Sequence, residues 1–205
     1  MKPHEIEQKS FAIIDEEAGD HGYPADHWPI VRRMIHTTAD FEYIQDTRIH
    51  PEAVTAGIGA IRSGSAIFTD TNMARVGIRQ NQLEPFGGQV HCLMADERIA
   101  RLAADKGITR AKAAVDAVAD QLDNGIYVVG NAPTALLRLI ELIRQGRTRP
   151  ALVVGLPVGF VNAAESKAEL LHLDTPYITN VGRKGGSNVA AAVVNALIVQ
   201  ARSDG

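Results

Sequence analysis

The sequence predicts a three-layer α/β domain in which a mainly parallel, doubly wound sheet of five strands lies between helices. From Ser65 onward, short apolar runs alternate with amphipathic helical segments, which favours parallel strands joined by right-handed crossovers. The strand runs are apolar on both faces, as a sheet covered on both sides requires. A length of 205 residues without a linker or low-complexity tract suits a single domain spanning residues 1–205.

Three helices are expected before the first strand. The first runs from Pro3 to Ala18, because a proline suits a first turn and Gly19 follows as a stop. After a turn-rich connection, the second runs from about Pro29 toward Thr38. The third is expected from Ile49 to Ile61.

Strands and helices alternate in the rest of the chain. The strands are expected at Ser65–Thr69, Val90–Met94, Ile126–Val129, Ala151–Val154 and Tyr177–Asn180. The helices are expected at Asn72–Val76, Asp96–Lys106, Thr109–Leu122, Ala135–Gln145, Ala164–Leu171 and Asn188–Ala201. Asp70 and Thr109 are placed to cap the helices that follow them.

Composition indicates an ordinary globular protein and argues against several classes. Apolar residues make up 45% and charged residues 22%, and a net charge of −3 argues against a nucleic-acid binder. No apolar run is long enough for a membrane span and the N-terminus lacks a signal peptide, so no membrane partner and a cytoplasmic location are expected. The single cysteine, Cys92, permits no intrachain disulfide and is expected to be a buried strand thiol.

The stretch Met34–Tyr43 concentrates groups capable of acid–base chemistry. Histidine changes its charge near neutral pH, and His36 is the histidine of this stretch. If the stretch is helical, Arg33 and Asp40 lie three and four residues from His36 on the same face. That arrangement fits an imidazole with a carboxylate that orients it. A helix end with a solvated histidine is the ordinary alternative.

Polar and glycine residues follow several predicted strands. Thr69 and Asp70 end one strand, Gly130 and Asn131 follow another, and Gly182–Ser187 follows the last. Because the carboxyl ends of parallel strands meet at one edge, where helix N-termini attract anions, a pocket for carboxylates or phosphates is expected there. Gly182–Ser187 matches neither the dinucleotide fingerprint nor the phosphate loop, and a tight turn is its ordinary interpretation. No cluster has metal-ligand spacing, so no metal site is expected.

Five blocks spread over nearly the whole chain carry a family resemblance. They are Arg32–Tyr43, Ser65–Arg75, Gly130–Ala135, Gly155–Val161 and Gly182–Ser187. Each is weak alone, but together and in this order they resemble the precorrin-8X methylmutases. These are cobalamin-pathway enzymes that move a methyl group within a corrin precursor.

The resemblance implies an isomerase that shifts a methyl group from C-11 to C-12 of precorrin-8X, giving hydrogenobyrinic acid, or that acts on cobalt-precorrin-8. His36 matches the family's catalytic histidine, a proton donor and acceptor, while Ser10 and Arg33 match its substrate-binding positions. The substrate carries many carboxylates, which arginine recognises well. Further contacts are expected from the matching blocks and from other cations: Thr69, Asp70, Thr71, Arg75, Asn131, Arg183 and Lys184, with Arg48 and Arg79 as additional candidates.

The resemblance also implies a homodimer that needs no cofactor, metal or methyl donor, since the methyl group stays within the molecule. Two alternatives remain open from the residues. A non-catalytic corrinoid carrier would use the same cations to hold its ligand. A nucleotide-dependent small-molecule α/β enzyme would use Gly182–Ser187 for phosphate. The sequence does not distinguish a metal-free from a cobalt-containing substrate.

Overall fold

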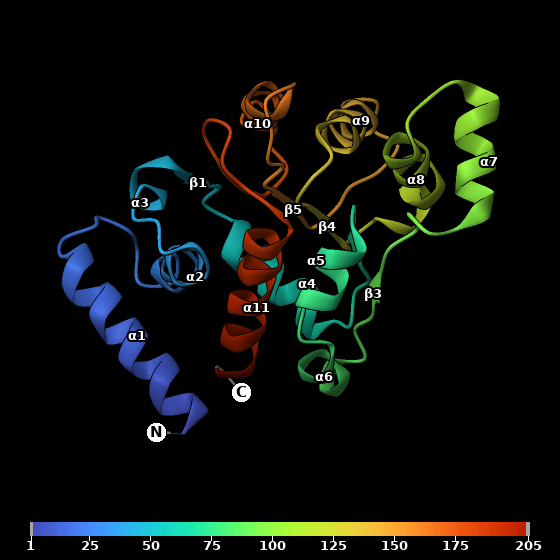
Figure 1. The fold of residues 1–205 in the computed structure, drawn as a ribbon. Helices are drawn as coiled ribbons and strands as arrows, with labels where there is room; N and C mark the ends of the chain where they lie inside the picture. The colour runs from blue at the N-terminus through green and yellow to red at the C-terminus, as the bar shows by residue number, and fades with distance from the viewer. Residues whose placement is uncertain (1, 204–205) are drawn as a thin grey trace.

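The computed structural model describes residues 2–203, and within them a six-stranded sheet lies between two layers of helices (Figure 1). The strands are β1 (Thr47–Ile49), β2 (Ile67–Thr69), β3 (Val90–His91), β4 (Ile126–Val129), β5 (Leu152–Gly155) and β6 (Tyr177–Asn180). Their order across the sheet is β1-β6-β5-β4-β2-β3. Five strands are parallel, and β1 pairs antiparallel with β6 at one edge. The predicted α/β class is confirmed.

The sheet has one strand more than the five predicted. The extra strand, β1, has only three residues, too few for an alternating pattern to stand out. Ile49 pairs with Ile178 in this strand, so the helix predicted to begin at Ile49 begins at Ala53 instead. The strand predicted at Val90–Met94 ends at His91, which leaves Cys92 half-buried beyond it rather than in a buried strand.

The helices form a layer on each face of the sheet (Figure 1). One layer contains α2 (Trp28–Thr38), α4 (Ala53–Arg62), α5 (Asn72–Gly77) and α11 (Ser187–Ser203), with α1 (Pro3–Ala18) outside α2. The other contains α8 (Arg110–Val118), α9 (Pro133–Arg144) and α10 (Ala163–Leu170), with α7 (Glu97–Lys106) outside α8. The connections hold α3 (Tyr43–Asp46), α6 (Gln80–Leu83) and the 3₁₀ turns Glu84–Phe86 and Ala119–Gln121.

Strand side chains alternate between two apolar cores. Ile126 and Val128 belong to the core that contains α11, whereas Tyr127 and Val129 belong to the core under α8 and α9. This alternation is the reason that the strands are apolar throughout. Helix α11 is rich in alanine and valine and largely buried, and it packs against α2, α4 and α5. No helix within residues 2–203 is long and apolar enough to cross a membrane.

Candidate active site

Two adjoining hollows beside α1 and α2 share one residue, His36. The first has a volume of about 430 Å³ and the second about 320 Å³. Each lies at the low end of the range for small-molecule sites, and together they offer room for a larger ligand. The first is lined by Ser10, Ile13, Ile14, Glu17, Ile35, His36, Ala39 and Phe41. The second is lined by Glu7, Arg33, His36, Thr37, Gly77, Arg79, Asn188, Ala191, Ala192 and Asn195.

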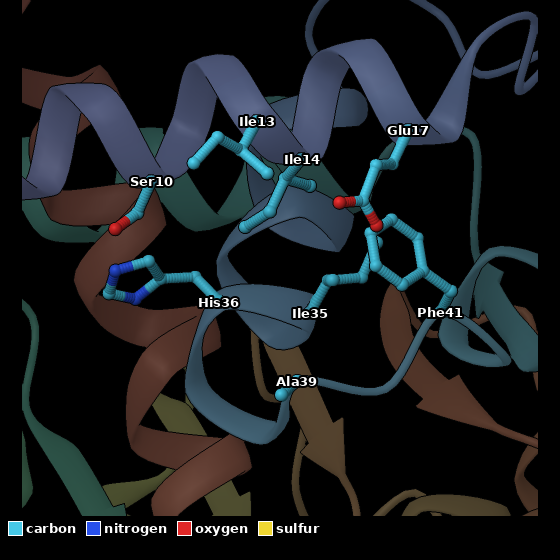
Figure 2. Close-up of a pocket in the computed structure, with 8 residues that line it drawn as sticks. All are labelled: Ser10, Ile13, Ile14, Glu17, Ile35, His36, Ala39 and Phe41. Carbon is cyan, nitrogen blue, oxygen red and sulfur yellow. The ribbon is translucent and has the colours of Figure 1, made fainter.

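His36 projects from the side of α2 that faces α1. The buried residues Met34 and Ile35 anchor this turn of the helix in the core, which fixes the backbone under the imidazole. The ring points toward Ser10 (Figure 2), and its centroid lies 5.1 Å from that of the Phe11 ring. Within residues 2–203 neither ring nitrogen of His36 makes a hydrogen bond. Both nitrogens are therefore available to a ligand in the hollows.

The first hollow is mainly apolar, with few polar groups in its walls. Ile13 and Ile14 of α1 face Ile35 and Phe41 across it (Figure 2). The Ser10 hydroxyl donates a hydrogen bond to the Ile6 carbonyl at 2.9 Å, which leaves its oxygen free to accept another bond. A flat, largely apolar ligand with polar groups at its edge suits such a surface.

The second hollow contains a cluster of two arginines and one glutamate. Arg33 is buried and donates from Nη1 to Oε1 of Glu7 at 2.5 Å, and Arg79 Nη2 reaches the same oxygen at 3.4 Å. Burial raises the pKa of Glu7, but the hydrogen bonds and charges of Arg33 and Arg79 outweigh it and leave that pKa lowered. Glu7 is therefore an anion at neutral pH. The guanidinium of Arg33 also lies over the Phe11 ring, 4.7 Å from its centroid.

Asp40 does not orient His36, contrary to the prediction from helical spacing. Helix α2 ends at Thr38, and Ala39 takes a left-handed conformation with φ of 53° that turns the chain away. Asp40 instead accepts a hydrogen bond from Nζ of Lys184 at 2.5 Å, and Lys184 also pairs with Glu42. The hydrogen bond from Lys184 lowers the pKa of Asp40, and the two carboxylates raise the pKa of Lys184. Lys184 is thus already neutralised by the protein's own acids.

Asp70 fills the position at the edge of the sheet where an anionic ligand was expected. The chain runs from β2 to β3 on one side of β2 and then crosses back to β4 on its other side, so the switch point lies between β2 and β4. There, the Asp70 carboxylate accepts N–H bonds from Gly130, Asn131 and Ala132 at 2.7–2.9 Å. Burial raises the pKa of Asp70 and these donors oppose the rise. The free N–H groups before α9 are therefore already bonded.

Thr71, not Asp70, caps helix α5. The Thr71 side chain accepts a hydrogen bond from the Ala74 N–H, whereas Asp70 points to the turn before α9. Thr71 Oγ1 also shares a hydrogen bond of 2.7 Å with Ser187 Oγ. The neighbouring Thr69 hydroxyl donates to backbone carbonyls. The Thr71 hydroxyl thus fixes the start of α11, where Asn188 lines the second hollow.

A buried lysine holds the turn that carries Arg183 and Lys184. Lys167 of α10 is 1% exposed, and its Nζ donates to the Lys184 carbonyl at 2.6 Å and to Asn180 Oδ1 at 3.2 Å. Burial lowers the pKa of Lys167 to about 8. The Arg183 side chain is exposed and lies over the Phe160 ring, 5.5 Å from its centroid. Sequence reasoning did not identify Lys167.

Comparison with known proteins decides the family. The family model described as precorrin-8X methylmutase matches residues 5–200. A cobalt-precorrin-8 methylmutase of Priestia megaterium is 46% identical over 203 residues, covering 99% of this chain and 90% of the relative. This chain belongs to the precorrin-8X methylmutase family. A precorrin-8X methylmutase of Pseudomonas aeruginosa is 40% identical, covering 95% of this chain and 94% of the relative. The crystal structure of the Thermus thermophilus precorrin-8X methylmutase, 48% identical, has a TM-score of 0.92 and covers 98% of both chains.

The methylmutase fold brings together four of the predicted residues, Ser10, Arg33, His36 and Arg79. The other predicted residues lie outside the two hollows. Asn131 is exposed beyond β4, Arg75 bonds Asn72 within α5, and the exposed Arg48 bonds nearby carbonyls of its own segment. Their contacts with substrate remain predictions.

Asn195 and Glu7 were missed by sequence reasoning although both line the second hollow. Asn195 accepts a hydrogen bond from the Arg79 N–H and donates to the Gly77 carbonyl, each at 2.9 Å, so it fixes the end of α5 beside the hollow. Its position as the polar residue within the apolar run from Val189 to Val199 was a usable signal. Glu7 gave no such signal, since it resembles any acidic residue in the first turns of a helix.

Within residues 2–203 no three histidine, cysteine, aspartate or glutamate side chains lie together as a metal site.

Proposed function

We propose that this chain is a precorrin-8X methylmutase of cobalamin biosynthesis. It moves a methyl group from C-11 to C-12 of precorrin-8X, or of the cobalt form of this substrate. The observation that carries the proposal is the His36 imidazole, which lies at the junction of two hollows with no hydrogen-bond partner among residues 2–203. It does so in a chain that matches the family over residues 5–200.

In the proposed mechanism, His36 donates a proton to the conjugated macrocycle. The proton makes the ring framework electron-poor, so the bond between the methyl group and C-11 breaks as its bond to C-12 forms. The rearranged macrocycle then returns a proton to His36, which restores the protonated imidazole. Acid–base catalysis of this kind typically contributes about 10²–10⁴-fold, and holding the ring in one conformation contributes more.

The two hollows would bind different parts of the substrate. The apolar walls formed by Ile13, Ile14 and Phe41 would cover part of the macrocycle and exclude water from the reacting carbons. Arg33 and Arg79 would bind carboxylates at its edge. Ser10 offers its hydroxyl oxygen between the two. A substrate with an apolar ring and peripheral carboxylates would match a site with aliphatic side chains on one side and cations on the other.

We further propose a homodimer in the cytoplasm. Phe160 is 84% exposed and Val161 77% exposed on the loop after β5, and Met73 on α5 is 68% exposed. Such exposed apolar side chains favour a protein interface. A partner subunit would enclose hollows that are open in one protomer. Light scattering at micromolar protein should give a mass of about twice 22.0 kDa, and a monomer at that concentration would contradict the proposal.

Replacing His36 with alanine tests the catalytic assignment. The variant should fold and should lose about 10²–10⁴-fold in rate, because the proton donor is gone. The assay follows the visible spectrum of precorrin-8X, and of its cobalt form in parallel, at substoichiometric protein. Replacing His172, exposed at the end of α10, is the matched control and should leave the rate unchanged.

The same assay separates the alternative functions. A corrinoid carrier would change the spectrum only in proportion to the protein added. A nucleotide-dependent enzyme would require an added cofactor. A folded His36→Ala variant that retains nearly the wild-type rate would disprove the role assigned to His36.

A further inference from the structure

Two guanidinium groups in the second hollow converge on a single carboxylate oxygen. Arg33 comes from the core side of α2 and has a side chain 10% exposed. Arg79 follows α5, has a side chain 40% exposed, and is held through its backbone N–H by Asn195. Both reach Oε1 of Glu7, which makes a shared and geometrically incomplete pairing. A carboxylate that offered each arginine its own oxygen would satisfy the pair better.

Glu7 lies on a peripheral helix, whereas the segments that carry its two partners are anchored nearer the core. It lies on α1, the outer helix, which packs against α2 at the edge of the molecule (Figure 1). Ile6 and Ile13 of the same helix are 52% and 45% exposed. The arginines, in contrast, are anchored by elements that pack against α11. A change in the Glu7 side chain therefore requires no rearrangement of the core.

We propose that Arg33 and Arg79 form a carboxylate subsite beside His36, that Glu7 occupies this subsite in the free enzyme, and that a peripheral carboxylate of the substrate displaces Glu7 on binding. The inference rests on the proposed function, since that function supplies a substrate rich in carboxylates. It adds Glu7 as an internal competitor, whose single negative charge offsets one of the two arginine charges when the site is empty.

The displacement has a consequence for affinity. Substrate must break the Glu7 pairing before its own carboxylate binds, so the pairing weakens apparent binding. The partly exposed Glu7 pairing contributes only a modest free energy, so its removal should change affinity by about twofold to fivefold. The competing interpretation is structural: Glu7 holds Arg33 and Arg79 in place for another purpose.

Four proteins distinguish the two interpretations: the wild type, Glu7→Gln, Arg79→Met and the double variant. If Glu7 is displaced, Glu7→Gln lowers KM by about twofold to fivefold, with a smaller change in kcat. Arg79→Met raises KM, and it does so in the Glu7→Gln background as well, because Arg79 contacts the substrate itself. Glu16→Gln, an exposed change on the same helix, should leave KM unchanged.

A purely structural role gives the opposite pattern. Glu7→Gln then raises KM, and Arg79→Met has no effect once Glu7 has been replaced, because the bond it would remove is already lost. Either result overturns the proposal. Thermal melting of each variant confirms that the compared proteins are folded.

Titration with hydrogenobyrinic acid, followed by its absorbance, repeats the comparison as a Kd that does not depend on turnover. If the wild type turns over precorrin-8X but Arg79→Met leaves KM and Kd unchanged, the subsite proposal alone is wrong. A wild type that neither turns over nor binds the product overturns the subsite together with the proposed function.

Discussion

Replacing Asp70 with asparagine isolates the contribution of the carboxylate that fills the switch point. One oxygen of Asp70 accepts from Gly130 at 2.9 Å, and the other accepts from Asn131 and Ala132 at 2.8 and 2.7 Å. An asparagine oxygen replaces the second, but its amide then faces the Gly130 N–H, donor against donor. Asp70 is 2% exposed, so that N–H is left without an acceptor in a buried site.

The expected cost is the loss of one charge-assisted bond and the burial of one unsatisfied donor, about 3 kcal/mol in total. For a chain of this length such a loss lowers Tm by roughly 6–12 °C. Urea unfolding and thermal melting measure it. Asp123→Asn is the matched control, because Asp123 accepts one N–H, that of Arg149, in an exposed position and should cost less than about 1 kcal/mol.

The result also bears on the sequence prediction that Asp70 contacts substrate. A stability loss with KM preserved in the folded variant supports the structural role. A variant as stable as the wild type but with a raised KM would refute the reasoning, because the carboxylate would then act on the substrate rather than on the turn before α9.

Two further changes test the packing around the site. The folded chain binds the Lys167 proton less tightly than the unfolded chain, in which the lysine has its ordinary pKa of 10.5. Raising the pH from 8 to 10.5 should therefore stabilise the wild type relative to Lys167→Met by about 3 kcal/mol, as measured by urea unfolding. A stability difference that does not change with pH would contradict this. Gly130→Ala places a Cβ 2.5 Å from the Ser187 Cα and should lower the free energy of unfolding by at least about 2 kcal/mol. The control Gly59→Ala, in α4, meets nothing within 4 Å and should raise that free energy by about 0.5–1 kcal/mol. Equal melting temperatures of the two variants would contradict the clash.

The elements with strong periodic signals were predicted closely. Helix α1 was placed at its observed bounds, and Thr109 caps α8 as expected, accepting from the Lys112 N–H. Errors occurred where the local signal was short or ambiguous. β1 has three residues and is stabilised by pairing with β6, a contact far away in the sequence.

Among the site residues, too, some roles were predictable from the sequence and others were not. His36 was recognisable because a histidine beside arginine and acidic residues is unusual on a helix, and the family resemblance added Ser10 and Arg33. The partner assigned to His36 was wrong because helical spacing was extended past Thr38, where the left-handed Ala39 ends the helix. The role of Asp70 was also predicted wrongly. The sequence shows that Asp70 carries a carboxylate that can accept N–H bonds, but it does not show that this carboxylate lies beside the turn before α9 and not beside the first N–H groups of α5.

The proposed position of the active site agrees with the contacts of Asp70 and Thr71. In most open α/β sheets the ligand binds at the switch point, where helix N-termini are free to bond it. Here Asp70 takes the N–H groups before α9, and the Thr71–Ser187 bond joins α5 to the start of α11. The hollows around His36 instead lie beside the sheet, in the helical layer, where α1 packs on α2, and we propose that the ligand binds there. A flat macrocycle suits that location better than a phosphate does, because the layer offers long aliphatic walls with arginines at one end.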